Sequence, residues 1–125
     1  MSVFKRATLY CSTITMKNQF DLLIDSYLEN KVGIDACFLN ENLSTGLQQN
    51  ILQLQRDEMM TAAGIGNEEV KDSQQKMRGD KIYWMDKTHN NIYEQEFLQL
   101  AEDFIDRLNS TCYTGINGYE FHYAV

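Results

Sequence analysis

Residues 77–86 read Met77-Arg78-Gly79-Asp80-Lys81-Ile82-Tyr83-Trp84-Met85-Asp86, and this stretch decides the fold prediction. A charged segment containing a glycine leads directly into a short apolar and aromatic run, a pattern typical of a strand entering a sheet. Arg78 and Asp80 then form a polar pair at the entrance of a predicted strand over residues 81–85. The tripeptide Arg78-Gly79-Asp80 is also an integrin-recognition sequence, but that interpretation requires an exposed extracellular loop rather than a strand entrance.

Amphipathic helices are predicted on both sides of this strand. Apolar residues recur at helical spacing over residues 17–30, from residue 40 or 42 to about 60, and over residues 92–109. Alternation of apolar and polar residues predicts further strands over residues 32–39 and 119–125. Residues 1–16 show no clear period, so we expect a poorly defined arm or strand there. Helices and strands are interleaved, which favours a mixed class, α+β or α/β in local pattern.

Composition limits the classes of partner. The chain has 125 residues and a formal net charge of −7, with 43% hydrophobic residues. One soluble globular domain fits this length, and an acidic surface disfavours nucleic acid and anionic membrane as partners. Apolar runs are far shorter than the roughly 20 residues of a membrane span, and no signal peptide is recognisable. Three scattered cysteines, Cys11, Cys37 and Cys112, favour free thiols and a cytoplasmic location.

Residue types that could hold a metal are few. A non-haem iron site needs two histidines and one carboxylate that converge on one face. Glu120 and His122 share a strand face, but their order is the reverse of a His-x-Asp pair, and His89 falls in a predicted solvated turn. We therefore predict no metal ligands and no catalytic residues within these 125 residues. Gly64 and Gly66 are predicted to form a turn, because the third glycine and the preceding strand of a dinucleotide loop are missing.

Several segments, in order, resemble the prolyl 4-hydroxylase-like branch of the 2-oxoglutarate and Fe(II) dependent oxygenases. Residues 35–39 with the helix that follows are similar to the entry to the family's long helix, and residues 63–66 resemble its small glycine loop. Residues 78–84 resemble its Arg-Gly-Asp-x-x-x-Trp motif, which is the most specific match. Residues 116–118 and the strand after them resemble the approach to the catalytic core. The resemblance covers residues 17–125.

The resemblance implies an α+β fold in which three helices pack on the incomplete major sheet of a double-stranded β-helix (jelly roll). It implies Fe(II), 2-oxoglutarate and ascorbate as cofactors and a prolyl peptide or protein as substrate. Arg78 and Asp80 would lie near the substrate entrance, and Trp84 would pack beneath it. His122 is added to the substrate-binding residues from strand parity, because it points away from Tyr119, Phe121, Tyr123 and Val125.

Two hypotheses follow for the function. In the first, residues 17–125 are the N-terminal helical and early-sheet part of an oxygenase, cut before the metal-binding motif and inactive in isolation, with a complementing C-terminal half as a possible partner. These residues contain no His-x-Asp sequence. In the second, the chain is a non-catalytic interaction module that pairs with another chain through the apolar edge strand 119–125.

Overall fold

The computed structural model describes residues 16–63 and 79–125. The elements are α2 (Met16–Asn30), α3 (Glu41–Arg56), β1 (Thr61–Ala62), β2 (Lys81–Trp84), α4 (Ile92–Cys112) and β3 (His122–Ala124). The strands form one antiparallel sheet in the order β1-β2-β3. The described residues therefore combine three helices with a small antiparallel sheet, and the predicted helices are confirmed with small shifts of their ends.

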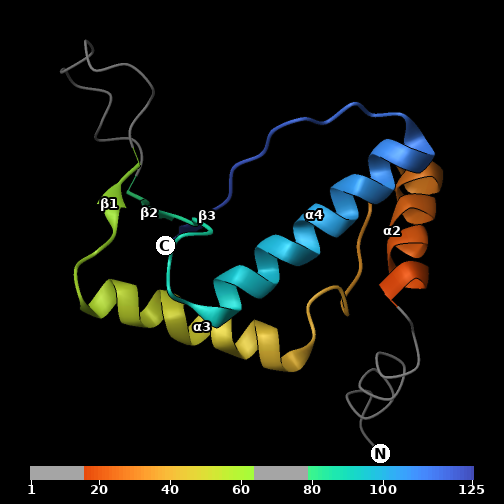
Figure 1. Cartoon of the computed structure of the whole chain (residues 1–125). Coiled ribbons are helices and arrows are strands. Elements are labelled where there is room, and N and C mark those ends of the chain that lie inside the picture. Colours follow the sequence, from red (N-terminus) through yellow and green to blue (C-terminus); the bar gives the residue numbers. More distant parts are fainter. Residues whose placement is uncertain (1–15, 64–78) are drawn as a thin grey trace, which may run out of the picture.

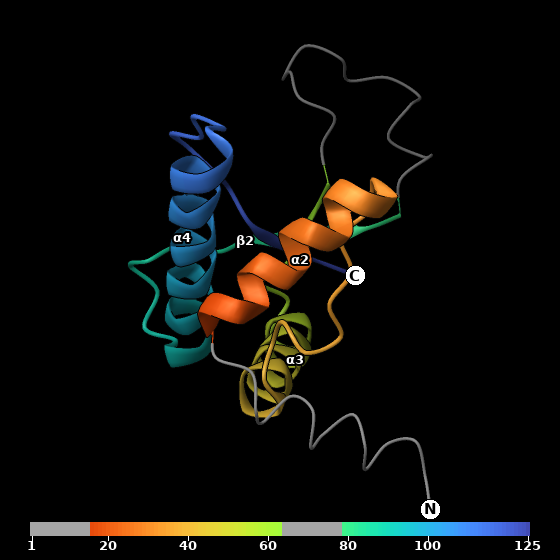
Figure 2. The same ribbon diagram turned by 90° about the vertical axis from the view of Figure 1, so that its right-hand side faces the viewer.

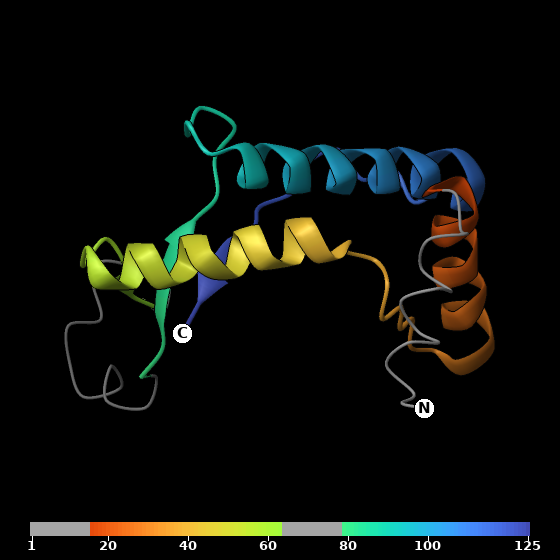
Figure 3. The same ribbon diagram turned by 90° about the horizontal axis from the view of Figure 1, so that it is seen from below.

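Helices α3 and α4 lie side by side and run in opposite directions (Figures 1 and 3). Helix α2 crosses the end of α4 that is remote from the sheet, as the view in Figure 2 also shows. The sheet lies at the opposite end, near the last turn of α3 and the first turn of α4 (Figure 3). Residues 113–121 return along α4 and bring β3 back beside β2 (Figure 1).

The hydrophobic core lies where α2, α3, α4 and the loop after α2 meet. Three phenylalanine rings form its centre: the ring centroid of Phe20 lies 5.2 Å from that of Phe104 and 6.0 Å from that of Phe38. Leu43 and Leu100 complete the buried cluster. Each of these residues belongs to an apolar stripe of its helix or to the loop, so burial of that stripe stabilises the helix packing.

The sheet register fixes which face of β2 and β3 meets the helices. Tyr83 lies opposite Tyr123, and Trp84 lies opposite His122. Tyr123 is buried, whereas His122 and Ala124 are exposed. Because successive side chains of a strand point to opposite faces, Tyr83 and Tyr123 lie on the helix-facing side and Trp84 and His122 lie on the open side.

The predicted strand over residues 32–39 is wrong, because these residues form turns and irregular loop. The side chain of Asp35 accepts a hydrogen bond from the backbone N–H of Cys37, 2.8 Å away, and its carbonyl accepts one from Phe38. An Asx turn of this kind bends the backbone and removes it from strand pairing. Phe38 and Leu39, at the end of this segment, pack on the core, whereas Val32 and Ile34 are exposed.

Other boundaries differ by smaller amounts. Helix α3 starts after the N-cap Asn40 and ends at Arg56, which leaves Thr61 and Ala62 free to form the short strand β1, an element that the sequence did not indicate. Helix α4 continues to Cys112 and is followed by Tyr113 in the left-handed conformation. The predictions for residues 1–15, for Gly64 and Gly66 and for Arg78 lie outside the described residues.

Gly46 allows the close approach of α3 and α4. A Cβ atom at this position would lie 2.2 Å from Cδ1 of Tyr93, far inside van der Waals contact. We expect Gly46→Ala to lower the free energy of unfolding by about 1–3 kcal/mol, because this clash exceeds the helix-propensity gain of ~1 kcal/mol. Urea titration measures this change. Gly118→Ala is the matched control, since nothing lies within 4 Å of its added Cβ, and an equal effect of both substitutions would contradict the packing.

The backbone hydrogen bonds of β3 give a second prediction. The N–H of Val125 donates to the carbonyl of Lys81 at 3.0 Å, whereas the register turns the N–H of Ala124 away from β2. Val125→Pro should therefore lower the free energy of unfolding by about 1 kcal/mol or more, and Ala124→Pro should change it much less. Chemical denaturation of the two variants tests the register. Equal destabilisation by both prolines would contradict the assigned register.

Candidate functional site

The open face of the sheet carries the residues that the sequence predicted for substrate binding. The rings of Trp84 and His122 contact each other edge to face across β2 and β3, with centroids 5.0 Å apart. Trp84 is 50% exposed, so it is not a core residue of the described part of the chain, and its packing beneath the substrate entrance stays a prediction. Its indole covers part of a sheet face that is not covered by the helices.

Asp80 and His122 do not lie together. Asp80 precedes β2 at one end, whereas His122 lies opposite Trp84 at the other end of that strand. Four residues of extended chain separate Asp80 from Trp84, a span of roughly 13 Å. Asp80 is half-buried, and its carbonyl accepts a hydrogen bond from the N–H of Ala63 at 3.1 Å. A ligand touching both Asp80 and His122 would have to lie along the length of β2, as an extended peptide does.

A buried carboxylate lies on the other side of the sheet, at the first turn of α4. Glu94 is 1% exposed, and its Oε2 lies 2.9 Å from Nδ1 of His89. The side chain of His89 is 33% exposed. The sequence prediction of a solvated turn histidine is therefore wrong: His89 connects the turn after β2 to α4. Removal of His89 would leave the buried carboxylate of Glu94 without this partner.

Two tyrosines enclose this pair. The ring of Tyr83 lies over His89 with centroids 5.3 Å apart, and Tyr123 follows at 6.5 Å from Tyr83. The hydroxyl of Tyr123 accepts a hydrogen bond of 3.0 Å from Nδ2 of Asn50 on α3. Burial raises the pKa of Tyr123 to about 12, and the negative charge of Glu94 adds to the rise. The described structure thus contains a polar network, Asn50–Tyr123–Glu94–His89, that connects α3, β3, α4 and the turn after β2.

One atom of this network lacks a hydrogen bond. Oε1 of Glu94 is buried and has no partner within the described part of the chain. The hydroxyl of Tyr123 accepts from Asn50, so its own proton is available to the carboxylate beside it.

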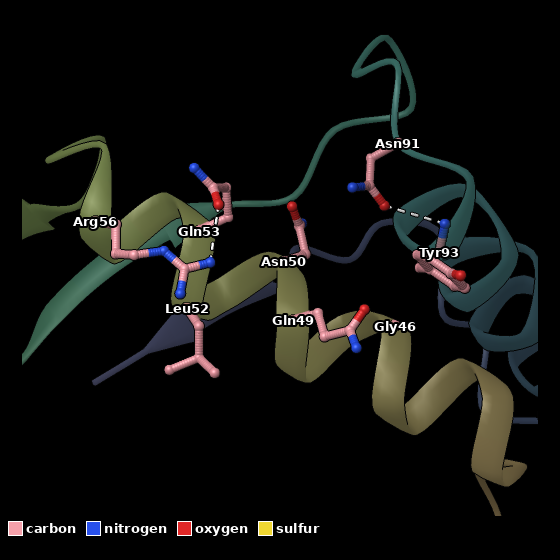
Figure 4. A pocket seen from close by; sticks show the side chains of 8 residues that line it. All are labelled: Gly46, Gln49, Asn50, Leu52, Gln53, Arg56, Asn91 and Tyr93. Atoms are coloured by element: carbon pink, nitrogen blue, oxygen red, sulfur yellow. Dashed lines mark hydrogen bonds between the residues drawn. The ribbon is translucent and has the colours of Figure 1, made fainter.

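A groove of about 500 Å³ lies between α3 and the start of α4 (Figure 4). Half of its eight lining residues carry amide side chains, and the others are Gly46, Leu52, Arg56 and Tyr93. Several of these polar side chains form hydrogen bonds within the fold. The side chain of Asn91 caps α4 by accepting hydrogen bonds from the N–H groups of Tyr93 and Glu94, and the guanidinium of Arg56 donates to Gln53 at 2.8 Å. The groove therefore offers few unused charged groups to a ligand.

A second cavity, of about 450 Å³, lies at the end of β2 and β3, where Trp84 and Glu120 are among its lining residues. Lys87 in its wall forms an ion pair with Glu102 of α4, and the hydroxyl of Tyr119 donates to the same carboxylate. The hydrogen bond from Lys87 lowers the pKa of Glu102. These contacts attach the turn after β2 and the segment before β3 to α4, so they position both strands.

The described residues do not fit Fe(II) or 2-oxoglutarate. No group of three or more His, Cys, Asp or Glu side chains within residues 16–63 and 79–125 is placed to hold a metal ion. The side chain of Arg107 is bonded to Asp21, and Lys87 is bonded to Glu102, so neither is directed at the open face. Any iron and cosubstrate chemistry thus requires residues other than the described ones.

Two further findings concern location. Cys37 is disulfide-bonded, whereas Cys112 is a free, exposed thiol. The prediction of free thiols is therefore wrong for Cys37, and cysteine usage no longer supports a cytoplasmic location. Within the described ranges, no helix has both the length and the apolar character to cross a bilayer.

Comparison of the chain with protein-family models, with curated proteins and with solved structures finds no match.

The raised pKa of Tyr123 predicts a loss of stability in alkali. The unfolded chain ionises its tyrosines near pH 10, whereas folded Tyr123 keeps its proton to about pH 12. The neutral phenol thus contributes its full stability below pH 10, and this contribution is lost as the pH rises from 10 to about 12. Urea unfolding at several pH values should show a smaller decline for Tyr123→Phe than for the native chain. Tyr27→Phe, on an exposed tyrosine of α2, is the control and should keep the native decline.

Proposed function

We propose that these residues form the helical support layer and early sheet of a prolyl 4-hydroxylase-like oxygenase domain. The whole domain would use Fe(II), 2-oxoglutarate and ascorbate to hydroxylate a prolyl peptide or protein. Within it, α2, α3 and α4 support one face of the sheet, and the open face is directed at the substrate. Arg78, Asp80 and His122 are the proposed substrate-binding residues.

One observation supports this proposal most. The Arg-Gly-Asp segment leads into β2, and β2 pairs antiparallel with β3, the strand after Ile116-Asn117-Gly118. The segment with the most specific match and the segment that resembles the approach to the catalytic core are thus neighbours in one sheet, although α4 separates them in the sequence. One face of these strands packs toward the helices and the other is open, as expected for the major sheet of a jelly roll.

A second function is favoured by a separate observation. Strand β3 lies at the edge of the described sheet, and its neighbour on one side is β2. The backbone N–H and C=O groups of His122 and Ala124 point away from β2, and such groups recruit additional strands. The chain would then act as an interaction module that pairs with another strand through residues 119–125.

Fragment complementation tests the first proposal. We expect the chain, joined to the C-terminal half of a prolyl 4-hydroxylase that carries the His-x-Asp pair and the distal histidine, to form succinate from 2-oxoglutarate when Fe(II) is added. The 125-residue chain alone should form none, because no ligand set for iron is found in its described part. A folded chimera without turnover contradicts the proposal, as does stoichiometric Fe(II) retention with turnover by the chain alone.

The same chimera tests the assigned binding residues. Asp80→Asn should raise the KM for a prolyl peptide while leaving succinate formation without peptide unchanged, because the residue is proposed to contact substrate rather than metal. Asp25→Asn on the exposed side of α2 is the matched charge control. Equal effects of the two substitutions on the peptide KM would remove Asp80 from the proposed entrance.

A further inference from the structure

Cys37 forms a disulfide bond, and the cysteine count identifies its partner. The chain contains three cysteines, Cys11, Cys37 and Cys112. Cys37 is disulfide-bonded, whereas Cys112 at the end of α4 is a free, exposed thiol. The structure contains one copy of the chain, so the second sulfur of the bond belongs to Cys11. Cys11 lies outside the described residues, and elimination alone assigns its covalent partner.

The place of Cys37 in the fold is compatible with this bond. Its loop lies against the first turn of α2, because the side-chain amide of Gln19 donates a hydrogen bond to the carbonyl of Cys37. Helix α2 begins at Met16, only five residues after Cys11, and five residues span at most roughly 18 Å. A disulfide brings its two Cα atoms to about 5–6 Å. The short connection therefore keeps Cys11 within reach of Cys37.

Helix α2 has little noncovalent packing to hold it in place. Among residues 19–30, Phe20 is its one buried side chain. Tyr27 and Leu28, farther along the same apolar stripe, are more than half exposed. Helix α2 also packs less extensively on α3 and α4 than these two helices pack on each other. Because a helix of 15 residues is marginal in water by itself, α2 depends on its attachment to the rest of the fold.

We propose that the Cys11–Cys37 disulfide is a redox-sensitive clamp that holds α2 on the rest of the described structure. The bond closes residues 11–37 into a ring that contains the whole of α2. The ring ends beside Phe38, whose aromatic ring lies between those of Phe20 and Phe104 in the core. Ring closure restricts the unfolded chain and so favours the packed state of the enclosed helix. The clamp is independent of the oxygenase and interaction-module functions.

Reduction by a dithiol opens this clamp in two steps. One thiolate of the dithiol attacks the sulfur of one cysteine and releases the other cysteine. The second thiolate then attacks the reductant's own sulfur in the mixed disulfide and releases the remaining cysteine. Cys11 and Cys37 take up the two protons and two electrons, and the dithiol becomes a cyclic disulfide. Helix α2 is then held by Phe20 and by the partly exposed ion pair of Arg107 and Asp21, a kind of pair that contributes little.

Peptide mapping of the unreduced full chain tests the pairing. After alkylation of free thiols, trypsin should release residues 7–17 linked to residues 32–56, and a dithiol should separate the two peptides. Residues 108–125 should carry the alkyl group on Cys112. An alkylated Cys37, a link between Cys37 and Cys112, or a disulfide between two copies of the chain would each overturn the proposal.

Hydrogen exchange of the full chain tests the clamp itself. Addition of the dithiol should speed amide exchange in residues 20–30 tenfold or more, because closing a ring of about 27 residues shifts a folding equilibrium by roughly two orders of magnitude. The amides of α3 and α4 should keep their protection. Cys11→Ser should reproduce the effect of the dithiol without any reductant. Cys112→Ser removes the free thiol, is the matched control, and should exchange like the native chain.

Two outcomes of the exchange experiment count against the clamp. Equal exchange of α2 in the oxidised and reduced chains would show that the bond does not hold the helix. Loss of protection in α2, α3 and α4 together would show that the bond stabilises the whole fold rather than α2. Either result overturns the proposal, even where peptide mapping finds the linked peptides.

Discussion

The burial of Tyr123 is the constraint on which the arrangement of sheet and helices depends. This side chain leaves β3 on its helix-facing side. Its hydroxyl accepts a hydrogen bond from Asn50 of α3, and the charge of Glu94 on α4 raises the pKa of this hydroxyl further. Because strand side chains alternate, placing Tyr123 inward places His122 and Ala124 outward. One buried hydroxyl thus decides which face of β2 and β3 is open, and so where Trp84 and His122 can meet a ligand.

The sequence predicted the elements whose signal is local and periodic. The apolar stripe of residues 43, 47, 51 and 54 marks α3, and those of α2 and α4 are equally clear. The alternation in residues 119–125 gave both β3 and the outward orientation of His122. The strand expected over residues 32–39 failed because Asp35 makes an Asx turn. A period of two in apolar residues does not by itself establish a strand, and Val32 and Ile34, which contribute to that period, are exposed.

The site was less predictable, because some of its contacts, such as that between Asn50 and Tyr123, join residues distant in the sequence. The contact between His89 and Glu94 is local. His89 and Glu94 are five residues apart, and the N-cap Asn91 starts a helix between them; a helix start that follows a histidine at this spacing was the available signal. The sequence contains no such signal for the exposure of Trp84, since an aromatic residue in a short strand can lie on the buried or on the exposed face of a sheet. Which face is covered is decided by Tyr123 and Asn50, 73 residues apart.

The two proposed functions make different demands on the same sheet. An oxygenase domain needs the open face of β2 and β3 and leaves α2, α3 and α4 as its outer support. An interaction module needs the outer edge of β3, where backbone groups rather than side chains make the contacts. Trp84 and His122 belong to the first surface, whereas the N–H of Ala124 belongs to the second. Substitutions can therefore test the two functions separately. A side chain on the open face can be replaced without altering the backbone edge of β3, and a proline at that edge leaves Trp84 and His122 in place.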